Sequence, residues 1–152
     1  LIYIIKYYKG KNLTLIFNPK ELMVNKESIT ASYRLLKQYM TFFVANDIDK
    51  KNNPVLLGYG RLKILDLFKK LKRDKYKKYI ILDDSFKDFF IEKPVEKISL
   101  FKKIFSKKHK ETNIYLQQYA NKIFPKENDR KVELKDIFIN QIEVLNIIFK
   151  TR

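Results

Sequence analysis

A single amphipathic helix, predicted from about Leu62 to Lys78, constrains the fold of this chain more than any other feature. Apolar side chains recur along it at spacings of three to five residues, at Ile64, Leu65, Phe68, Leu71 and Tyr76. A stripe on its other side is strongly basic and contains Lys63, Lys69, Lys70, Arg73, Lys77 and Lys78. The sequence therefore predicts a helix with one apolar face and one cationic face.

Strand-like segments surround this helix in the sequence. Between Glu27 and Asn46 the residues are largely β-branched and aromatic, which predicts two strands. Thr41 to Tyr59 is interpreted as a hairpin whose long tip is the polar, turn-rich stretch from Asn46 to Pro54. After the helix, Tyr79 to Leu82 is predicted to be a buried strand. The first half of the chain should therefore combine helix and sheet.

The N-terminal region and the middle of the chain suggest the domain organisation. Leu1 to Tyr8 and Asn12 to Asn18 are β-prone runs around Gly10, which predicts a hairpin. Pro19 suits the first turn of a short helix. Pro94 follows a connecting segment and is the best boundary between two halves. We thus expect an N-terminal extension at residues 1–18, an α+β domain at 19–93 and a C-terminal β/α domain at 94–152.

Shorter elements are expected in the C-terminal domain. Val95 to Phe105 is predicted to supply one or two strands. Thr112 is expected to cap a helix that runs to about Phe124. The periodicity from Val132 to Phe149 is helical, with an expected break near Gln141.

The charge of the chain calls for a polyanionic partner. Lysine and arginine number 33 against 17 aspartate and glutamate residues, for a formal net charge of +16 and a pI of about 9.8. A nucleic acid backbone and an anionic membrane surface both satisfy this excess. The basic residues are spread along the whole chain among tyrosines and phenylalanines, which favours RNA. A membrane tether would more often concentrate the basic residues in one amphipathic helix or tail, so no membrane partner is expected. No apolar run approaches the ~20 residues that span a bilayer.

Groups that carry catalysis are scarce. There is no cysteine, and the single histidine, His109, lies among lysines and is interpreted as an exposed loop residue. Asp47 and Asp49 begin like a calcium loop, but the glycine at its sixth position and the bidentate glutamate are missing. Acids after the last predicted strand are interpreted as a loop or helix-start cluster rather than a magnesium site, namely Asp83, Asp84 and Asp88. We therefore expect no enzyme, metal or cofactor.

Gly58-Tyr59-Gly60 marks the junction between strand and helix. A lone pair of glycines lacks the further residues of a dinucleotide fingerprint or a P-loop. The two glycines say more about the structure, because glycine permits a close backbone approach. Arg61 then lies where a helix N-terminus meets an anion. A basic stripe on a helix usually does no more than face the solvent. The excess of cations in nearly every element, however, favours contact with phosphate. The candidate RNA-binding residues are Arg34, Lys50, Lys51, Arg61, Lys63, Lys70, Arg73 and Lys77.

Short motifs then resemble a known family. The chain has Phe43-Val44-Ala45-Asn46, Gly58-Tyr59-Gly60-Arg61 and Lys77-Lys78-Tyr79-Ile80-Ile81. These resemble, in order, the Val-Gly-Asp strand end, the Gly-x-Gly-Lys turn and the Lys-Lys-Asn-Leu-Ile helix end of the small-subunit ribosomal protein S-five family. Near the C-terminus, Lys135-Asp136-Ile137-Phe138 and Leu145-Asn146-Ile147-Ile148 are similar to two further family motifs. The glycine-rich stretch of the family is absent between residues 100 and 115.

The resemblance implies a fold and a role. It implies an α+β chain, with a double-stranded-RNA-binding-like α-β-β-β-α domain followed by a small β/α domain. It implies binding to small-subunit ribosomal RNA near the messenger entry path, beside ribosomal proteins of the S-four and S-eight families. Heavy use of Lys, Ile, Asn, Phe and Tyr indicates an AT-rich gene. An organelle genome, here mitochondrial, explains that usage, and so does an AT-rich nuclear, bacterial or viral genome.

Two other classes of binding protein remain open. One is a nucleic-acid-binding module of viral or mobile-element origin, which would prefer single-stranded DNA to structured RNA. The other is a basic accessory subunit of an organellar membrane assembly. In each case the function expected is binding, with no reaction.

Overall fold

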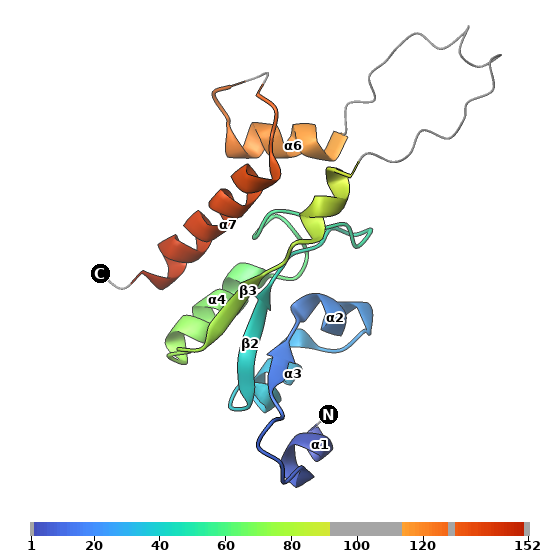
Figure 1. Ribbon diagram of the computed structural model, residues 1–152, viewed down its shortest axis with the longest axis vertical. Coiled ribbons are helices and arrows are strands. Elements are labelled where there is room, and N and C mark those ends of the chain that lie inside the picture. The colour runs from blue at the N-terminus through green and yellow to red at the C-terminus, as the bar shows by residue number, and fades with distance from the viewer. Residues whose placement is uncertain (1, 92–113, 128–129, 151–152) are drawn as a thin grey trace, which may run out of the picture. The chain divides into compact units, whose positions relative to one another are not determined.

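A computed structural model of the protein describes residues 2–91, 114–127 and 130–150 (Figure 1). The elements are α1 (Ile2–Tyr7), β1 (Leu15–Phe17), α2 (Pro19–Val24), α3 (Ile29–Leu36), β2 (Met40–Ala45), α4 (Ile64–Arg73), β3 (Tyr79–Leu82), the 3-10 helix η1 (Ser85–Phe89), α6 (Ile114–Ile123) and α7 (Leu134–Phe149). They form two compact units, residues 1–84 with 141–152 and residues 85–140. The described chain is thus a mixture of helix and strand.

The first unit contains a three-stranded parallel sheet in the order β1-β2-β3. Parallel neighbours need a crossover between them, and here α2 and α3 connect β1 to β2 while α4 connects β2 to β3. The register places Phe43 between Phe17 and Ile80, and Phe42 between Ile16 and Tyr79. Because side chains alternate along a strand, these two rows lie on opposite faces of the sheet.

One face of the sheet is packed into the core. Phe17 and Phe43 are almost fully buried, and their rings stack 5.7 Å apart. The ring of Phe43 also meets that of Phe68 on α4 edge-on, at 5.9 Å. In Figure 1, α3 and α4 lie behind the strands and cover this face. Burial of each such side chain stabilises the fold by about 1.5–3 kcal/mol.

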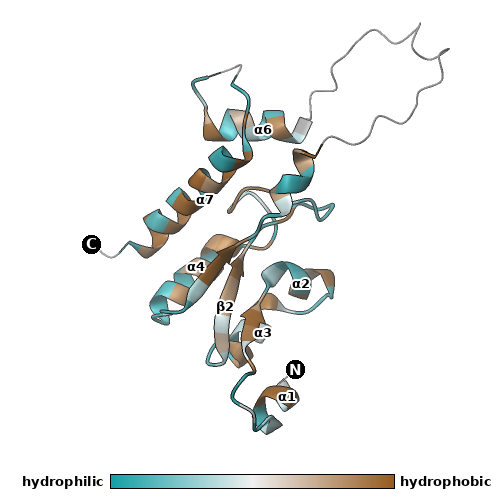
Figure 2. Cartoon of the chain, viewed as in Figure 1, coloured by the Kyte–Doolittle hydropathy of each residue, from teal (hydrophilic) through white to brown (hydrophobic). Residues whose placement is uncertain are grey.

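The opposite face is uncovered in the part of the chain that the structure describes. Ile16, Tyr79 and Ile81 are 55%, 66% and 40% exposed, and Phe42 and Val44 between them are half-buried. Figure 2 shows apolar colouring on the strands that carry this face. Parallel sheets are normally covered on both faces, so an open apolar face is the unusual feature of this unit.

The second unit is held mainly by aromatic side chains. Phe86 of η1 packs edge-on against Tyr119 of α6, with ring centroids 5.4 Å apart. The guanidinium carbon of Arg130 lies 3.8 Å from the ring centre of Phe124, a cation–π contact. At the start of α7, a carboxylate oxygen of Asp136 accepts a hydrogen bond from the Glu133 N–H at 2.9 Å. This last bond satisfies a backbone donor that the helix itself cannot.

Several predicted elements are confirmed. A helix begins at Pro19, the basic amphipathic helix is α4, and Tyr79 to Leu82 is a strand. α6 and α7 lie where C-terminal helices are predicted, although α7 has no break near Gln141. The predicted strand at residues 95–105, the domain boundary at residue 94 and the cap at residue 112 lie outside the described residues.

Both predicted hairpins are wrong. Ile2–Tyr7 is helical, since a short apolar run has no period that separates strand from helix. The stretch after β2 does not return as a strand: it makes only an isolated bridge between Ile48 and Pro54. The first of the two strands predicted from Glu27 to Asn46 is instead α3, because the Ser28 hydroxyl accepts a hydrogen bond from the Ala31 N–H at 3.3 Å and caps a helix.

The order and direction of the strands also differ from the expectation. Residues 19–91 run helix, helix, strand, helix, strand and 3-10 helix, and the remaining strand comes from residues 15–17, which were assigned to an extension. The α-β-β-β-α order of a double-stranded-RNA-binding domain is therefore not the observed one. β3 is also half exposed rather than buried, because helices cover only one face of its sheet.

Candidate nucleic-acid interface

The loop after β2 is organised by one buried carboxylate. Asp47 is 2% exposed, and its Oδ1 accepts hydrogen bonds from the N–H groups of Ile48 at 3.0 Å and Leu62 at 3.1 Å. Its Oδ2 accepts from the N–H groups of Gly58 at 3.1 Å and Gly60 at 3.0 Å. Burial raises the pKa of Asp47, and the bonds from the four N–H groups oppose that rise. The carboxylate therefore fixes the loop by holding four of its backbone N–H groups.

The two glycines fit this arrangement. Gly58 has a φ of +88°, in the region that favours glycine. A Cβ on Gly60 would collide with the Asp47 carboxylate and with the Ile48 carbonyl oxygen. The close backbone approach expected at this junction is therefore an approach to Asp47.

A second aspartate shapes the tip of the loop. Asp49 Oδ1 accepts hydrogen bonds from the N–H groups of Lys51 at 2.7 Å and Asn53 at 2.9 Å. Although partial burial acts against it, the hydrogen bonds from Asn53 and Lys51 hold the pKa of Asp49 below its usual value. This turn leaves Lys50 and Lys51 exposed, beyond the carboxyl end of β2.

Three of the eight candidate residues lie around one cavity at the carboxyl ends of the strands. Arg61, Lys63 and Lys70 line it together with Ser28 and Thr30 at the start of α3. Lys63 takes a left-handed backbone conformation with a φ of +52° as it leads into α4. Arg61 and Lys63 precede α4, and Lys70 lies in its last turn. The helical period predicts a shared face only for Lys63 and Lys70.

Three further candidates, Arg34, Arg73 and Lys77, lie nearer the amino ends of the strands. Arg34 is exposed on α3, and Lys77 is exposed just before β3. The Arg73 Nε donates to Asp74 Oδ1 at 3.0 Å, while Lys37 Nζ donates to Asp74 Oδ2 at 3.0 Å. The structure therefore divides the predicted contacts between the two ends of the sheet and does not gather them into one site.

Asp74 is the centre of a small network at the amino end. The Tyr33 hydroxyl donates to Asp74 Oδ2 at 3.0 Å, in addition to the two cations. The Lys37 ammonium and the Arg73 guanidinium lower the pKa of Asp74 to about 2. Burial and the carboxylate together raise the pKa of Tyr33. Asp74 is thus a fixed anion among cations.

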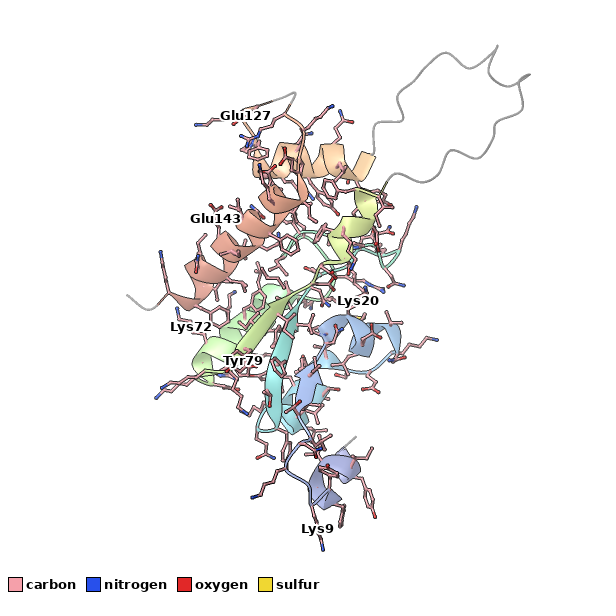
Figure 3. All side chains as sticks on the ribbon, in the orientation of Figure 1. Lys9, Lys20, Lys72, Tyr79, Glu127 and Glu143 are labelled. Atoms are coloured by element: carbon pink, nitrogen blue, oxygen red, sulfur yellow. The ribbon has the colours of Figure 1, made fainter. Side chains whose placement is uncertain are left out.

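An aromatic pair on the uncovered face was missed by the sequence analysis. The rings of Phe42 and Tyr79 stack with centroids 5.5 Å apart and planes at 26°. Tyr79, labelled in Figure 3 at the start of β3, is 66% exposed. Lys77 and Lys78 directly precede it and are exposed. No signal for it is present in the sequence, because Tyr79 to Leu82 is a continuous apolar run without alternation.

Asp83, the first acid after β3, belongs to a hydrogen-bonded cluster at the carboxyl ends of the strands. Asn46 Nδ2 donates to Asn18 Oδ1 at 2.9 Å and to Asp83 Oδ2 at 3.1 Å. No group of three histidine, cysteine, aspartate or glutamate side chains suited to a metal ion occurs among the described residues. His109 lies outside them. None of the helices in the described ranges has the length and apolar character that crossing a bilayer requires.

Comparison with known proteins assigns no family. No protein family model, no curated protein and no solved structure matches the chain.

Proposed function

We propose that this protein binds single-stranded RNA across the uncovered face of its sheet and catalyses no reaction on it. The observation that carries the proposal is the Phe42–Tyr79 ring stack on an open sheet face, in which Tyr79 is exposed and is preceded by exposed lysines. A base stacked on Tyr79 would extend the stack that the two rings already form. Lys77 and Lys78 lie beside it for the phosphates.

The chemistry of the face suits unpaired bases. Aromatic side chains on a sheet accept bases by stacking, a contact worth about 1–3 kcal/mol per base and tolerant of sequence. Ile16, beside Phe42 on β1, and Ile81, two residues after Tyr79 on β3, extend the apolar surface around the ring pair. An apolar surface alone would suit a protein partner equally well, but the adjoining cations favour a polyanion.

The basic residues near Tyr79 support phosphate contact. Lys75, Lys77 and Lys78 are all exposed in the connection from α4 to β3. None of these three forms an ion pair with another residue in the described ranges. Binding of phosphate by such lysines releases counterions, so the affinity should fall steeply with salt.

The small ribosomal subunit of a mitochondrion is the narrower setting that we propose for this binding. The support for it is the resemblance of short motifs to the S-five family and the net charge of +16. The strand order that the resemblance implied is not the observed one, so only the short motifs and the net charge support the ribosomal setting. If the native protein sediments apart from small ribosomal subunits at low salt, the ribosomal setting is wrong while RNA binding itself stays open.

The experiment for RNA binding uses fluorescence anisotropy of the full chain with a labelled 12-nucleotide oligouridine. Tyr79→Ala should weaken binding by about 5 to 150 times, the equivalent of one lost stacked base. Tyr59→Ala is the matched control, because Tyr59 is similarly exposed (59%) but lies in the loop after β2. Circular dichroism verifies that both variants fold.

A second pair of variants separates phosphate contact from net charge. Replacing Lys77 and Lys78 by alanine should reduce the slope of log affinity against log salt by about 1.4, since each single-strand phosphate contact contributes about 0.7. Replacing Lys50 and Lys51 removes the same charge at the opposite end of β2 and should leave the slope nearly unchanged. Equal effects of the two double variants, or a preference for duplex RNA, would overturn the proposal.

A further inference from the structure

We propose that the cavity at the carboxyl ends of the strands binds a small organic phosphate. The cavity has a volume of about 440 Å³ and is lined by the cations Arg61, Lys63 and Lys70. Pockets for small molecules commonly measure about 300–1,000 Å³. This site is separate from the proposed RNA face, which lies around Tyr79 on the other side of the sheet.

The cavity lies between the amino-terminal parts of α3 and α4. Arg61 belongs to the loop that follows β2, and Ser28 and Thr30 belong to the connection that follows β1. Both connections begin at the carboxyl ends of their strands. The sheet therefore places side chains from two crossovers around a single space.

The charge of the lining favours an anion. Three cations face two acids there, Glu27 and Asp66. Asp66 Oδ1 also receives a weak contact from Lys69 Nζ at 3.5 Å, which offsets part of its charge. The surplus suits one phosphate group, and Arg61 presents the forked donors that bind phosphate oxygens best.

Hydrogen bonds fix the position of Arg61. Its Nη2 donates to Asn52 Oδ1 at 2.6 Å, which uses one of the five N–H donors of the guanidinium. Its backbone N–H donates to the Ile48 carbonyl oxygen at 2.9 Å. Asp47 fixes the residues on either side through Gly60 and Leu62. A fixed cation loses little freedom on binding, which favours affinity.

The rest of the lining suits the carbon part of the ligand. Met23, Ile29, Leu62 and Leu67 contribute apolar surface to the same cavity. Inorganic phosphate would leave this surface unused. An organic phosphate, with its phosphate on the cations and its carbon skeleton on the apolar side chains, satisfies both parts.

The test is titration calorimetry of the full chain with adenosine monophosphate, inorganic phosphate and adenosine as probes. Adenosine monophosphate should bind more tightly than inorganic phosphate, and adenosine should bind at least ten times more weakly than its phosphate. The variant with Arg61→Ala and Lys63→Ala should weaken binding of adenosine monophosphate at least tenfold. Tyr79→Ala and Lys75→Ala should leave it unchanged.

A second variant keeps the test decisive if the double variant fails to fold. Thr30→Asp adds a negative charge to the cavity from an exposed position on α3, where the fold has little reason to change. It should abolish binding of the phosphates while thermal unfolding stays as in the unaltered protein. Absence of binding by adenosine monophosphate, or binding that survives Thr30→Asp, would overturn the proposal without bearing on RNA binding.

Discussion

Replacement of Asp47 by alanine should destabilise the protein more than any other single change in the loop after β2. The substitution removes the acceptor of four backbone N–H bonds of 3.0–3.1 Å. The bonds to Ile48 and Leu62 lie in a buried setting, so their donors would be left without a partner. Each unsatisfied buried donor costs about 1–3 kcal/mol.

The expected loss is about 1–5 kcal/mol in the free energy of unfolding. Two stranded donors give about 2–6 kcal/mol, and relief from burying a charged carboxylate offsets part of the cost. A loss of that size is a large share of the about 5–15 kcal/mol that stabilises a typical domain. Asp47→Asn should cost less, because the amide oxygen keeps part of the acceptor capacity.

Urea unfolding followed by circular dichroism measures this loss. Asp66→Ala is the control, since the side chain of Asp66 is 62% exposed and its ion pair with Lys69 is worth at most about 1 kcal/mol. A loss below about 1 kcal/mol for Asp47→Ala would refute the reasoning, because it would mean that the four bonds do not hold the loop.

Two further predictions follow from the same contacts. Gly60→Ala should cost about 2 kcal/mol or more by thermal or urea unfolding, because its Cβ meets the Asp47 carboxylate and the Ile48 oxygen, whereas Gly10→Ala meets only the flexible Tyr8 side chain and should cost little. The depressed pKa of Asp74, about 2 against an ordinary 3.8, predicts about 1 kcal/mol of stability that is present above pH 3.8 and disappears as the pH falls through 2. Asp74→Asn should remove that pH dependence, and an unchanged acid profile would contradict the network.

The features that the sequence predicts best are those with a local period or a local cap. The apolar spacing of α4 identifies the helix, and Pro19 identifies the start of α2. The end of α4 is harder to predict. Lys75 follows Asp74 with a φ of +53°, a conformation usually left to glycine, and the chain turns there rather than at residue 78.

The direction of the strands has no local signal. β1 and β3 have only three and four residues, and their neighbour β2 is reached through crossovers of more than twenty and more than thirty residues. Nothing within such short runs distinguishes a hairpin from a parallel pair. The cap at Ser28 was the missed clue, because a helix between β1 and β2 makes their parallel pairing possible.

The candidate residues were predicted from charge, and charge alone does not tell which cations share a surface. Arg61, Lys63 and Lys70 meet at one cavity because Asp47 bends the loop back toward α4. Tyr79 was predicted to lie in a buried strand. Its exposure depends on which face of the sheet the helices cover, and the sequence of the strand does not contain that information. The loop was indicated in the sequence by a polar residue directly after an apolar strand, followed by Gly58 and Gly60.

The proposal of RNA binding is tested most directly by ultraviolet crosslinking of the full chain to a uridine-rich single strand, with the adducts mapped by mass spectrometry. If RNA lies on the open sheet face, nucleotide adducts should occur at Tyr79 or Phe42, and Tyr79→Ala should remove most of them. Adducts confined to other parts of the chain, with Tyr79 and Phe42 unmodified, would contradict it.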